Sequence, residues 1–267
     1  MTGKQVTYDQ ILQLLGGFEA ISLPEMDSVR LQNRTEKKFV MHISKIEPLL
    51  ELAREEYKVL EINDQRLLEY STEYFDTLDN AMYLAHHNGR QNRYKVRKRE
   101  YMVSGEQFLE VKRHLTNGRT QKKRVEISGT PNNELSGHTF IESATPYQLD
   151  GLEKKLDNTF HRVTLTSHRL KERITIDMGL KFSIGTTHIE LPSIAIIEIK
   201  KDKAGALSGF ELILRKMGIH GSSVSKYCIG RALLEPKLKA NLFQNKIRYL
   251  IKLNALVHDH INTDKPA

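Results

Sequence analysis

The pattern of apolar and polar positions acquires a period of two residues at Asn33. In the segment NRTEKKFVMH, the charged residues Arg34, Glu36 and Lys38 share one face of an extended chain, and apolar residues such as Phe39 share the other. Successive side chains of a strand point to opposite faces. The alternation therefore predicts a strand with one charged face and one apolar face.

Short helices and further strands are predicted around this segment. The lead-in, residues 1–29, contains one helical run that ends at Gly16 and Gly17, and we expect it to lie outside the core. Ser44 and Glu47 have the spacing of a capping box ahead of an apolar stripe, which predicts a helix to about Glu56. Strands are predicted over 58–62 and 67–76, followed by a helix over 79–87 that Asn88-Gly89 ends.

The next three predicted strands each carry their basic residues on a single face. The apolar residues Leu109, Val111 and Val125 occupy the opposite parity. The charged faces hold Arg93, Lys95, Arg97 and Arg99 in the first strand, Glu110 and Lys112 in the second, and Lys122, Arg124 and Glu126 in the third.

The alternation returns in the C-terminal half. A loop over 128–146 and a helical stretch near 147–157 are predicted first, and a helix from Ser208 to Gly218 and a long amphipathic helix from Leu238 to Ile261 come last. Between them, the charged faces of three strands hold Arg162, then Arg173 and Asp177, then Glu198 and Lys200.

Solvent exposure alone would account for one such charged face, but the sign of the charges favours a ligand. The chain has 41 Lys and Arg against 33 Asp and Glu, a net charge of +8. Like charges about 6 Å apart repel by roughly 3 kcal/mol at an effective dielectric of about 20, so a sheet of cations favours a bound polyanion. About eight antiparallel strands closed into a barrel would enclose such a ligand.

Acidic residues share the same faces and suggest a metal ion. Carboxylates such as Glu36, Glu110, Glu126, Asp177 and Glu198 could pair with the cations or hold Mg²⁺ or Mn²⁺ against phosphate oxygens. The chemistry implied is phosphoryl transfer, which requires positioning and charge stabilisation rather than a protein nucleophile.

Several other classes of protein are disfavoured. A single cysteine, Cys228, excludes a disulfide framework and a zinc ribbon and suits a reducing compartment. We find no signal peptide, no membrane span, and no P-loop or dinucleotide-binding motif. Trp is absent and aromatic residues do not interleave with the basic strands, which disfavours nucleic acid as a partner. We expect a cytoplasmic protein, either free or peripheral to the inner face of the membrane through a separate membrane protein.

From Asn33 to Gly230 the sequence resembles the VTC domain, the polyphosphate polymerase branch of the triphosphate tunnel metalloenzymes, also called the CYTH-like class. The order and spacing of the motifs carry the resemblance. They are RTEKKF at 34–39, YFDT at 74–77, KVRKREY at 95–101, LEVK at 109–112, KKR at 122–124, HRVTL at 161–165, RITID at 173–177, IIEIK at 196–200 and SKY at 225–227.

The resemblance implies an α+β fold, an antiparallel eight-stranded β-barrel or triphosphate tunnel with helices packed outside. The implied organisation is a lead-in over 1–29, a tunnel domain over 30–230 and a helical extension over 231–267 that packs on the same domain. The implied activity is transfer of the γ-phosphate of ATP to a growing polyphosphate chain with Mn²⁺ or Mg²⁺.

The resemblance also implies roles for individual residues. The positions expected to act on the phosphates are Lys38, Arg97, Arg99, Lys112, Lys122, Arg162, Arg173 and Lys226. Further phosphate contacts are expected from Arg34, Lys95, Arg124, Lys200 and Ser225. Glu198 is the expected metal ligand, with Glu36 as a second candidate.

One departure from the class pattern bears on the activity. The first strand reads Arg34-x-Glu36-x-Lys38 where the wider class has Glu-x-Glu-x-Lys, and the loss of one acid favours a polymerase over a two-metal triphosphatase. A triphosphatase of the same fold and a polyphosphate-binding module without catalysis stay open as alternatives, as does the oligomeric state.

Overall fold

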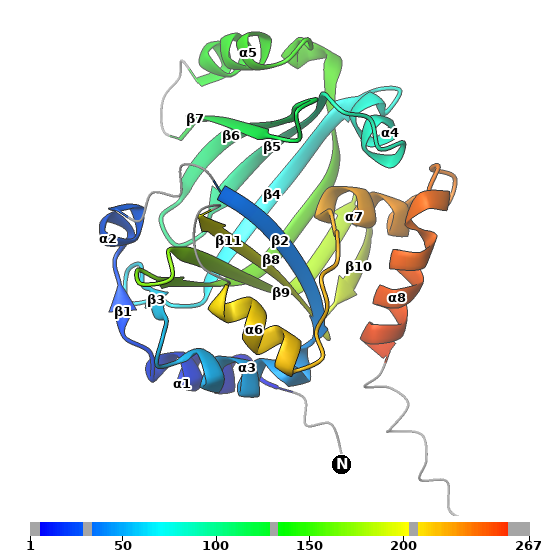
Figure 1. The fold of residues 1–267 in the computed structure, drawn as a ribbon. Helices are drawn as coiled ribbons and strands as arrows, with labels where there is room; N and C mark the ends of the chain where they lie inside the picture. Colours follow the sequence, from blue (N-terminus) through cyan, green and yellow to red (C-terminus); the bar gives the residue numbers. More distant parts are fainter. Residues whose placement is uncertain (1–5, 29–33, 129–132, 203–207, 256–267) are drawn as a thin grey trace, which may run out of the picture.

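The centre of the molecule is a strongly curled antiparallel sheet (Figure 1). The computed structural model describes residues 6–28, 34–128, 133–202 and 208–255. Eight strands follow one another in the order β2-β11-β9-β8-β4-β5-β6-β7. Their bounds are Arg34–His42 for β2, Leu68–Thr77 for β4, Arg93–Tyr101 for β5, Glu106–His114 for β6, Thr120–Glu126 for β7, Leu152–Ser167 for β8, Glu172–Ile184 for β9 and Ile194–Asp202 for β11.

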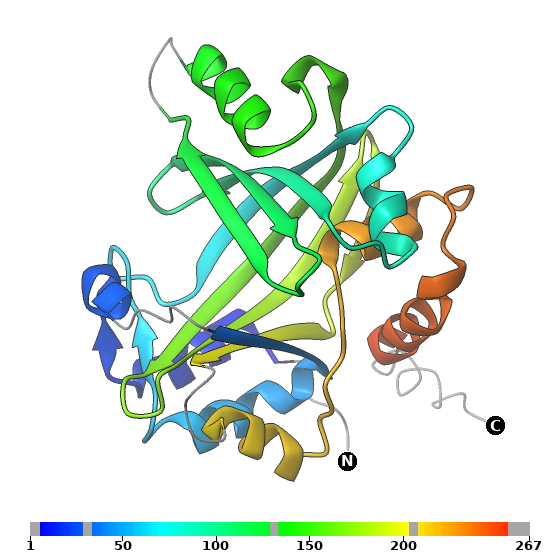
Figure 2. The same cartoon turned by 45° about the horizontal axis from the view of Figure 1, so that its top comes forward.

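Three short strands join this path from the side. Strand β10, Thr187–Leu191, pairs with β9, and β3, Lys58–Leu60, pairs with β8 and in parallel with β1, Ala20–Ile21. Strands β2 and β7 end the eight-strand path, and no ladder joins them within the described ranges. The expected eight-stranded antiparallel architecture is confirmed, as a half-barrel whose two end strands are not hydrogen-bonded to each other (Figure 2).

Helices flank the sheet on its outer side and at its ends, as expected. Their bounds are Tyr8–Gly16 for α1, Leu23–Ser28 for α2, Ile46–Ala53 for α3, Ala81–His87 for α4, Asn133–Ala144 for α5, Gly209–Lys216 for α6, Lys226–Leu234 for α7 and Gln244–Ala255 for α8. None of the described helices is both long enough and apolar enough to cross a membrane.

Helices α1, α3 and α6 cover the apolar side of β9 and β11. The buried residues Leu49 and Leu50 of α3 and Leu214 of α6 form one cluster with Ile176 and Ile197 of the sheet. Because apolar burial on this side points every second residue of the strands away from the helices, the charged parity faces the inside of the curl.

The lead-in contributes to this core, contrary to our expectation. Ile11 and Leu15 of α1 are almost fully buried and belong to the same cluster as α3. The expectation that residues 1–29 lie outside the core is therefore wrong for the described residues 6–28. The predicted helical run is present as the nine-residue α1, and the burial of its apolar residues against α3 was not expected.

The predicted capping box of Ser44 and Glu47 is also wrong. Helix α3 begins at Ile46 after a 3₁₀ turn over Ile43–Lys45, and the backbone N–H of Ser44 donates to His42 Nδ1 at 3.2 Å. The backbone of Ile43 is still held to the sheet by a 2.8 Å bond to Ser193 O, so the helix cannot start earlier. It ends at Ala53 rather than near Glu56.

The loop predicted over 128–146 and the helix predicted near 147–157 are both wrong. Helix α5 lies in the predicted loop, and β8 begins at Leu152, within the predicted helix. Leu152, Leu156 and Phe160 recur every four residues, which suits either a helix or a strand. Pairing of β8 with β4 and β9 makes this segment a strand, and burial of Ile141 against the outer face of β5 and β6 stabilises α5.

The three remaining predicted helices are present, and the helix predicted over 79–87 is α4. Ser208 caps α6 by accepting a hydrogen bond from Glu211 N at 3.0 Å, and Gly218 follows the helix with a positive φ. The C-terminal helix is shorter at its start than predicted, because a 3₁₀ turn over Asn241–Phe243 precedes α8. Its predicted continuation over 256–261 lies outside the described residues.

A pair of leucines in α1 tests whether the lead-in stabilises the fold. Leu15 is fully buried, whereas Leu12 in the same helix is 46% exposed. We expect Leu15→Ala to lower the free energy of unfolding by about 2–4 kcal/mol, through lost burial and a cavity, and Leu12→Ala to change it by less than about 0.5 kcal/mol. Urea denaturation followed by circular dichroism measures both, and equal midpoints for the two variants would contradict the role of α1.

Candidate functional site: a basic cavity inside the curled sheet

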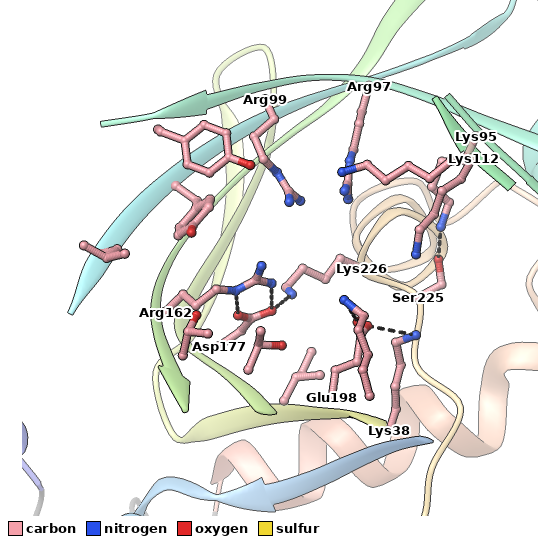
Figure 3. Close-up of a pocket in the computed structure, with 18 of the residues that line it drawn as sticks. Lys38, Lys95, Arg97, Arg99, Lys112, Arg162, Asp177, Glu198, Ser225 and Lys226 are labelled. Carbon is pink, nitrogen blue, oxygen red and sulfur yellow. Dashed lines mark hydrogen bonds and ion pairs between the residues drawn. The ribbon is translucent and has the colours of Figure 1, made fainter. Parts of the chain in front are cut away.

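The inner face of the sheet surrounds a cavity of about 610 Å³. Thirteen Lys and Arg side chains line it, against four Asp and Glu. Most of the cations come from strands on opposing walls (Figure 3). Lys226 of α7 and Lys246 of α8 add two more from helices. The cavity therefore concentrates positive charge on the inner face of the sheet, whereas the outer face is apolar.

One wall carries a row of three lysines on neighbouring strands. In the antiparallel register, Lys95 of β5 lies directly opposite Lys112 of β6, which lies opposite Lys122 of β7. Like charges in directly opposite positions destabilise a sheet. Burial, together with the charge of the nearby Arg97, lowers the pKa of each of these lysines to about 8.

A buried glutamate compensates part of this charge. Glu110, on β6, is 1% exposed and accepts a hydrogen bond from Arg97 Nε at 2.6 Å and a second from Lys122. Burial alone would raise the pKa of Glu110, but Arg97, Arg99 and Lys122 lower it far below its usual range. The carboxylate thus holds Arg97 and Lys122 in place on the wall of the cavity.

Arg99 is buried, and among the residues that the structure describes no carboxylate lies at hydrogen-bond distance from it. Its side chain is 6% exposed, its Nε has no hydrogen-bond partner in the described part of the chain, and its guanidinium lies 5.6 Å from the ring centroid of Tyr70. Burial and the adjacent Arg97 lower the pKa of Arg99. A buried guanidinium with an unused donor is a strong site for an incoming anion, because the cost of desolvation is already present in the free protein.

The opposite wall carries an arginine, a lysine and one shared aspartate. Arg162 of β8 donates two hydrogen bonds to Asp177 of β9, from Nε at 2.5 Å and from Nη2 at 2.7 Å (Figure 3). Lys226, the first residue of α7, donates to the same carboxylate. Burial would raise the pKa of Asp177, but Arg162 and Lys226 lower it to about 2, so this carboxylate stays ionised and holds both cations.

A block of alternating charge lies where β2 pairs with β11. Lys38 is opposite Glu198, and Glu36 is opposite Lys200. Lys38 Nζ lies 3.2 Å from Glu198 Oε2 and also donates to Glu36, while Lys200 Nζ lies 2.6 Å from Glu198 Oε1. Burial would raise the pKa of Glu198, but Lys200 and Lys38 keep it well below the usual range of a glutamate.

The start of α7 brings a hydroxyl into the same cavity. Ser225 is the N-cap residue, and its hydroxyl accepts a hydrogen bond from Cys228 N at 3.4 Å and from Lys95 Nζ at 2.9 Å. The sequence Ser-Lys-Tyr therefore places Ser225 and Lys226 at the N-terminal end of a helix, where the helix dipole favours a negatively charged ligand.

The structure brings nearly all of the sequence-predicted site residues together. Those that line the cavity are Lys38, Lys95, Arg97, Arg99, Lys112, Lys122, Arg124, Arg162, Arg173, Glu198, Lys200, Ser225 and Lys226. Glu36 does not line it but contacts Lys38 and lies 3.9 Å from Lys112 Nζ. The backbone of Arg34 pairs with Asp202, and its side chain is outside the described part of the structure.

Sequence reasoning missed two groups of cavity residues. Lys246 of α8 lines the cavity and donates to Ser223 Oγ at 2.6 Å. An amphipathic pattern predicts the helix but not the surface on which the helix packs, so the sequence did not place Lys246 at the cavity. The aromatic residues Tyr70 and Tyr74 of β4 also line the cavity. Their alternation in the sequence is equally typical of core residues, so it does not indicate a ligand site.

A curled antiparallel sheet with converging cations inside it is the architecture that the sequence resemblance implies. The sequence profile of the VTC domain family matches residues 33–235. The chain therefore belongs to the VTC domain family. No curated protein matches the sequence.

Similar solved structures have low sequence identity. A Hippeastrum protein provisionally assigned as an adenylyl cyclase, and described as having a dominant triphosphatase activity, is 16% identical with a TM-score of 0.46, and the match covers 78% of this chain and 97% of that one. A provisionally assigned adenylate cyclase from Vibrio parahaemolyticus is 14% identical with a TM-score of 0.44, over 73% of this chain and 96% of that one.

The lysine row predicts that anion binding depends on pH. With a pKa of about 8, Lys112 and Lys122 are mostly charged at pH 7 and mostly neutral at pH 9, so the affinity for tripolyphosphate should fall over this range. Replacing both with arginine, which stays charged, should reduce the fall. Isothermal titration calorimetry of both proteins gives the two pH profiles.

Comparing the wild type with the variant cancels the contribution of the ligand to the pH dependence of the affinity. Tripolyphosphate itself titrates near these pH values, but equally for both proteins. Parallel pH profiles for the wild type and the Lys112→Arg/Lys122→Arg variant would contradict the assigned titration of these lysines.

Proposed function

We propose that this chain is a metal-dependent phosphotransferase that binds ATP and polyphosphate in the basic cavity and transfers the γ-phosphate to the growing polyphosphate chain. The observation that carries the proposal is the excess of cations over acids on the inner wall, thirteen against four. The cations in a cavity of this charge repel one another when it is empty, and a linear chain of phosphates would offset this repulsion. Membership of the VTC domain family supports the same ligand class.

The proposed roles of the cations follow from their places on the two walls. Arg97, Arg99 and the lysine row of Lys95, Lys112 and Lys122 would contact the phosphates from one wall. From the facing walls, Arg162, Arg173, Lys226, Lys38 and Lys200 would contact them, with Arg124 and Ser225 completing the set. Because buried acids already hold Arg97, Arg162 and Lys226, these donors need little reorganisation when the ligand binds.

The proposed transfer is an in-line displacement at the γ-phosphorus. A terminal oxygen of the acceptor polyphosphate forms a bond to this phosphorus while the bond to the β–γ bridging oxygen breaks, and ADP leaves with that electron pair. Cations on both sides of the cavity hold the two anionic reactants in line and offset their mutual repulsion. Arginine and lysine also stabilise the negative charge that develops on the bridging oxygen.

Glu198 and Glu36 fit the needs of a divalent metal ion, Mn²⁺ or Mg²⁺. Both carboxylates contact Lys38, so their oxygen atoms lie around one point at the edge of the cavity. Within the described ranges, no three His, Cys, Asp or Glu side chains gather in one place, and oxygens of the phosphate chain and of water would complete the coordination, as is usual for these hard cations. When bound, the ion would neutralise phosphate charge.

A product analysis tests the proposal directly. The purified protein is incubated with ATP and Mn²⁺, and the products are separated on a polyacrylamide gel stained for polyphosphate, beside an assay of free phosphate. We expect a ladder of long chains together with ADP. Free phosphate without a ladder would indicate a triphosphatase, and polyphosphate binding without either product would indicate a binding module.

Replacement of Glu198 tests the metal site. Glu198→Gln removes the charge that would bind the ion but leaves the cations of the cavity, so we expect turnover to fall at least about a hundredfold and tripolyphosphate affinity to stay within a few-fold of wild type or increase. Glu190→Gln, an exposed glutamate of β10 that pairs with Lys181, is the matched control and should keep full activity. Unchanged turnover in Glu198→Gln would remove this residue from the metal site.

A further inference from the structure

The motif YFDT at residues 74–77 contains an aspartate that does not reach the cavity. Asp76 stands near the end of β4, is completely buried, and is not among the residues that line the cavity. Burial of a carboxylate is costly unless hydrogen bonds replace its lost hydration. The partners of Asp76 therefore show what this residue does.

Asp76 joins β4 to the first turn of α4. Its Oδ1 accepts hydrogen bonds from Thr77 N at 2.8 Å and Met82 N at 2.9 Å. Its Oδ2 accepts one from Tyr83 N at 2.8 Å. The first N–H groups of a helix have no acceptor within the helix itself. Asp76 therefore caps α4 from the preceding strand.

The same carboxylate binds a tyrosine of α7. Tyr227 is 2% exposed, and its hydroxyl donates to Asp76 Oδ2 at 2.5 Å. The hydroxyl also accepts a hydrogen bond from Arg231 Nη1 at 2.9 Å, and Arg231 Nη2 donates to Asn80 Oδ1 at 2.9 Å. Burial and the neighbouring Asp76 raise the pKa of Tyr227, so the phenol keeps the proton that it donates. Strand β4 and helices α4 and α7 thus meet in one buried network (Figure 1).

Aromatic packing orients the ring of Tyr227 within this network. Its centroid lies 5.2 Å from that of Tyr74 and 6.2 Å from that of Tyr83. The guanidinium of Arg231 lies 5.7 Å from the same ring. Side chains that interdigitate in a core have little freedom, so the bond to Asp76 holds the backbone of α7 as well as the hydroxyl.

Lys226, the residue before Tyr227, enters the cavity from α7. With 3.6 residues per turn, successive side chains of a helix point in directions about 100° apart. Lys226 therefore faces the cavity while Tyr227 packs behind it. In the cavity, Lys226 Nζ donates to Asp177 and lies 4.2 Å from the centroid of the Phe160 ring (Figure 3).

The position of Lys226 has a different origin from that of most cations in the cavity. Most of the others belong to strands, where the register of the sheet sets the backbone. Lys226 belongs to a helix, so its position depends on how α7 packs. Four residues earlier, Ser222 N donates to Lys38 O of β2 at 2.7 Å. Tyr227 is adjacent to Lys226, and its bond to Asp76 holds the first turn of α7 against β4.

We infer that Tyr227, held by Asp76, is a positioning residue that sets where Lys226 meets the phosphates. Neither Tyr227 nor Asp76 lines the cavity, so the link acts from behind its wall. The inference rests on the proposed function, in which Lys226 contacts the phosphates, and adds to it the contact that keeps this cation in place.

Removal of one hydroxyl tests the link. Tyr227→Phe keeps the packed ring but removes the bond to Asp76, and isothermal titration calorimetry measures its affinity for inorganic tripolyphosphate. Residues of one hydrogen-bonded network are coupled, so we expect tripolyphosphate to bind at least about fivefold more weakly than to the wild type. In Lys226→Met, which has no cation left to position, the same replacement should change the affinity by less than about twofold.

Tyr57→Phe is the matched control. Tyr57 is also 2% exposed and donates to a buried carboxylate, that of Glu172, but it packs in the cluster on the apolar side of the sheet and does not line the cavity. We expect this variant to lose stability in urea denaturation and to keep the wild-type affinity. The control therefore separates positioning of Lys226 from general destabilisation.

Two results would overturn the inference alone. An unchanged affinity in Tyr227→Phe would show that Lys226 does not need this support. An equal loss with and without Lys226 would show that Tyr227 acts through another group. Absence of tripolyphosphate binding in the wild type would overturn the proposed function and the inference with it.

Asp76→Asn tests the other end of the link. The amide keeps the size of the side chain but replaces one acceptor oxygen with a donor. We expect weaker binding of tripolyphosphate to this variant, and little further loss when Tyr227→Phe is added to it. Losses that add fully in the double variant would contradict a shared route through the bond between Asp76 and Tyr227.

Discussion

Repulsion among cations on the inner face of a curled sheet is the constraint on which the rest of this structure depends. Lys95, Lys112 and Lys122 occupy directly opposite positions on three neighbouring strands, an arrangement that costs stability in any antiparallel sheet. The cost is tolerated because it is balanced in two ways. Buried acids such as Glu110 and Asp177 hold individual cations, and apolar packing on the outer face holds the strands.

The outer core and the inner site are two consequences of the same alternation. Helices α1, α3 and α6 bury every second residue of β9 and β11, so the remaining residues of those strands can only point inward. Burial on the outside thus preorganises the cations inside. A rigid wall of charged donors binds an anion without the reorganisation that flexible surface lysines would need.

The acids of the site have separate tasks that their surroundings explain. Glu110 and Asp177 are nearly inaccessible and fully used by the cations beside them, so they stabilise the wall. Glu198 and Glu36 lie at the edge between β2 and β11, among lysines that a ligand could draw away. The proposed metal site uses this second pair, because a bound phosphate chain would draw the lysines away from these carboxylates.

The sequence by itself determined which residues share a face, because a period of two acts locally within each strand. It therefore identified Lys38, Arg97, Arg162 and Glu198 as members of one charged surface, and its motif order identified the family. Only the tertiary structure decided which of these residues meet, because pairing and register join segments far apart in the chain. The alignment of Lys95 with Lys112 and Lys122, the strand rather than helix at Leu152 and the burial of α1 all depend on such contacts, and no local pattern contains them.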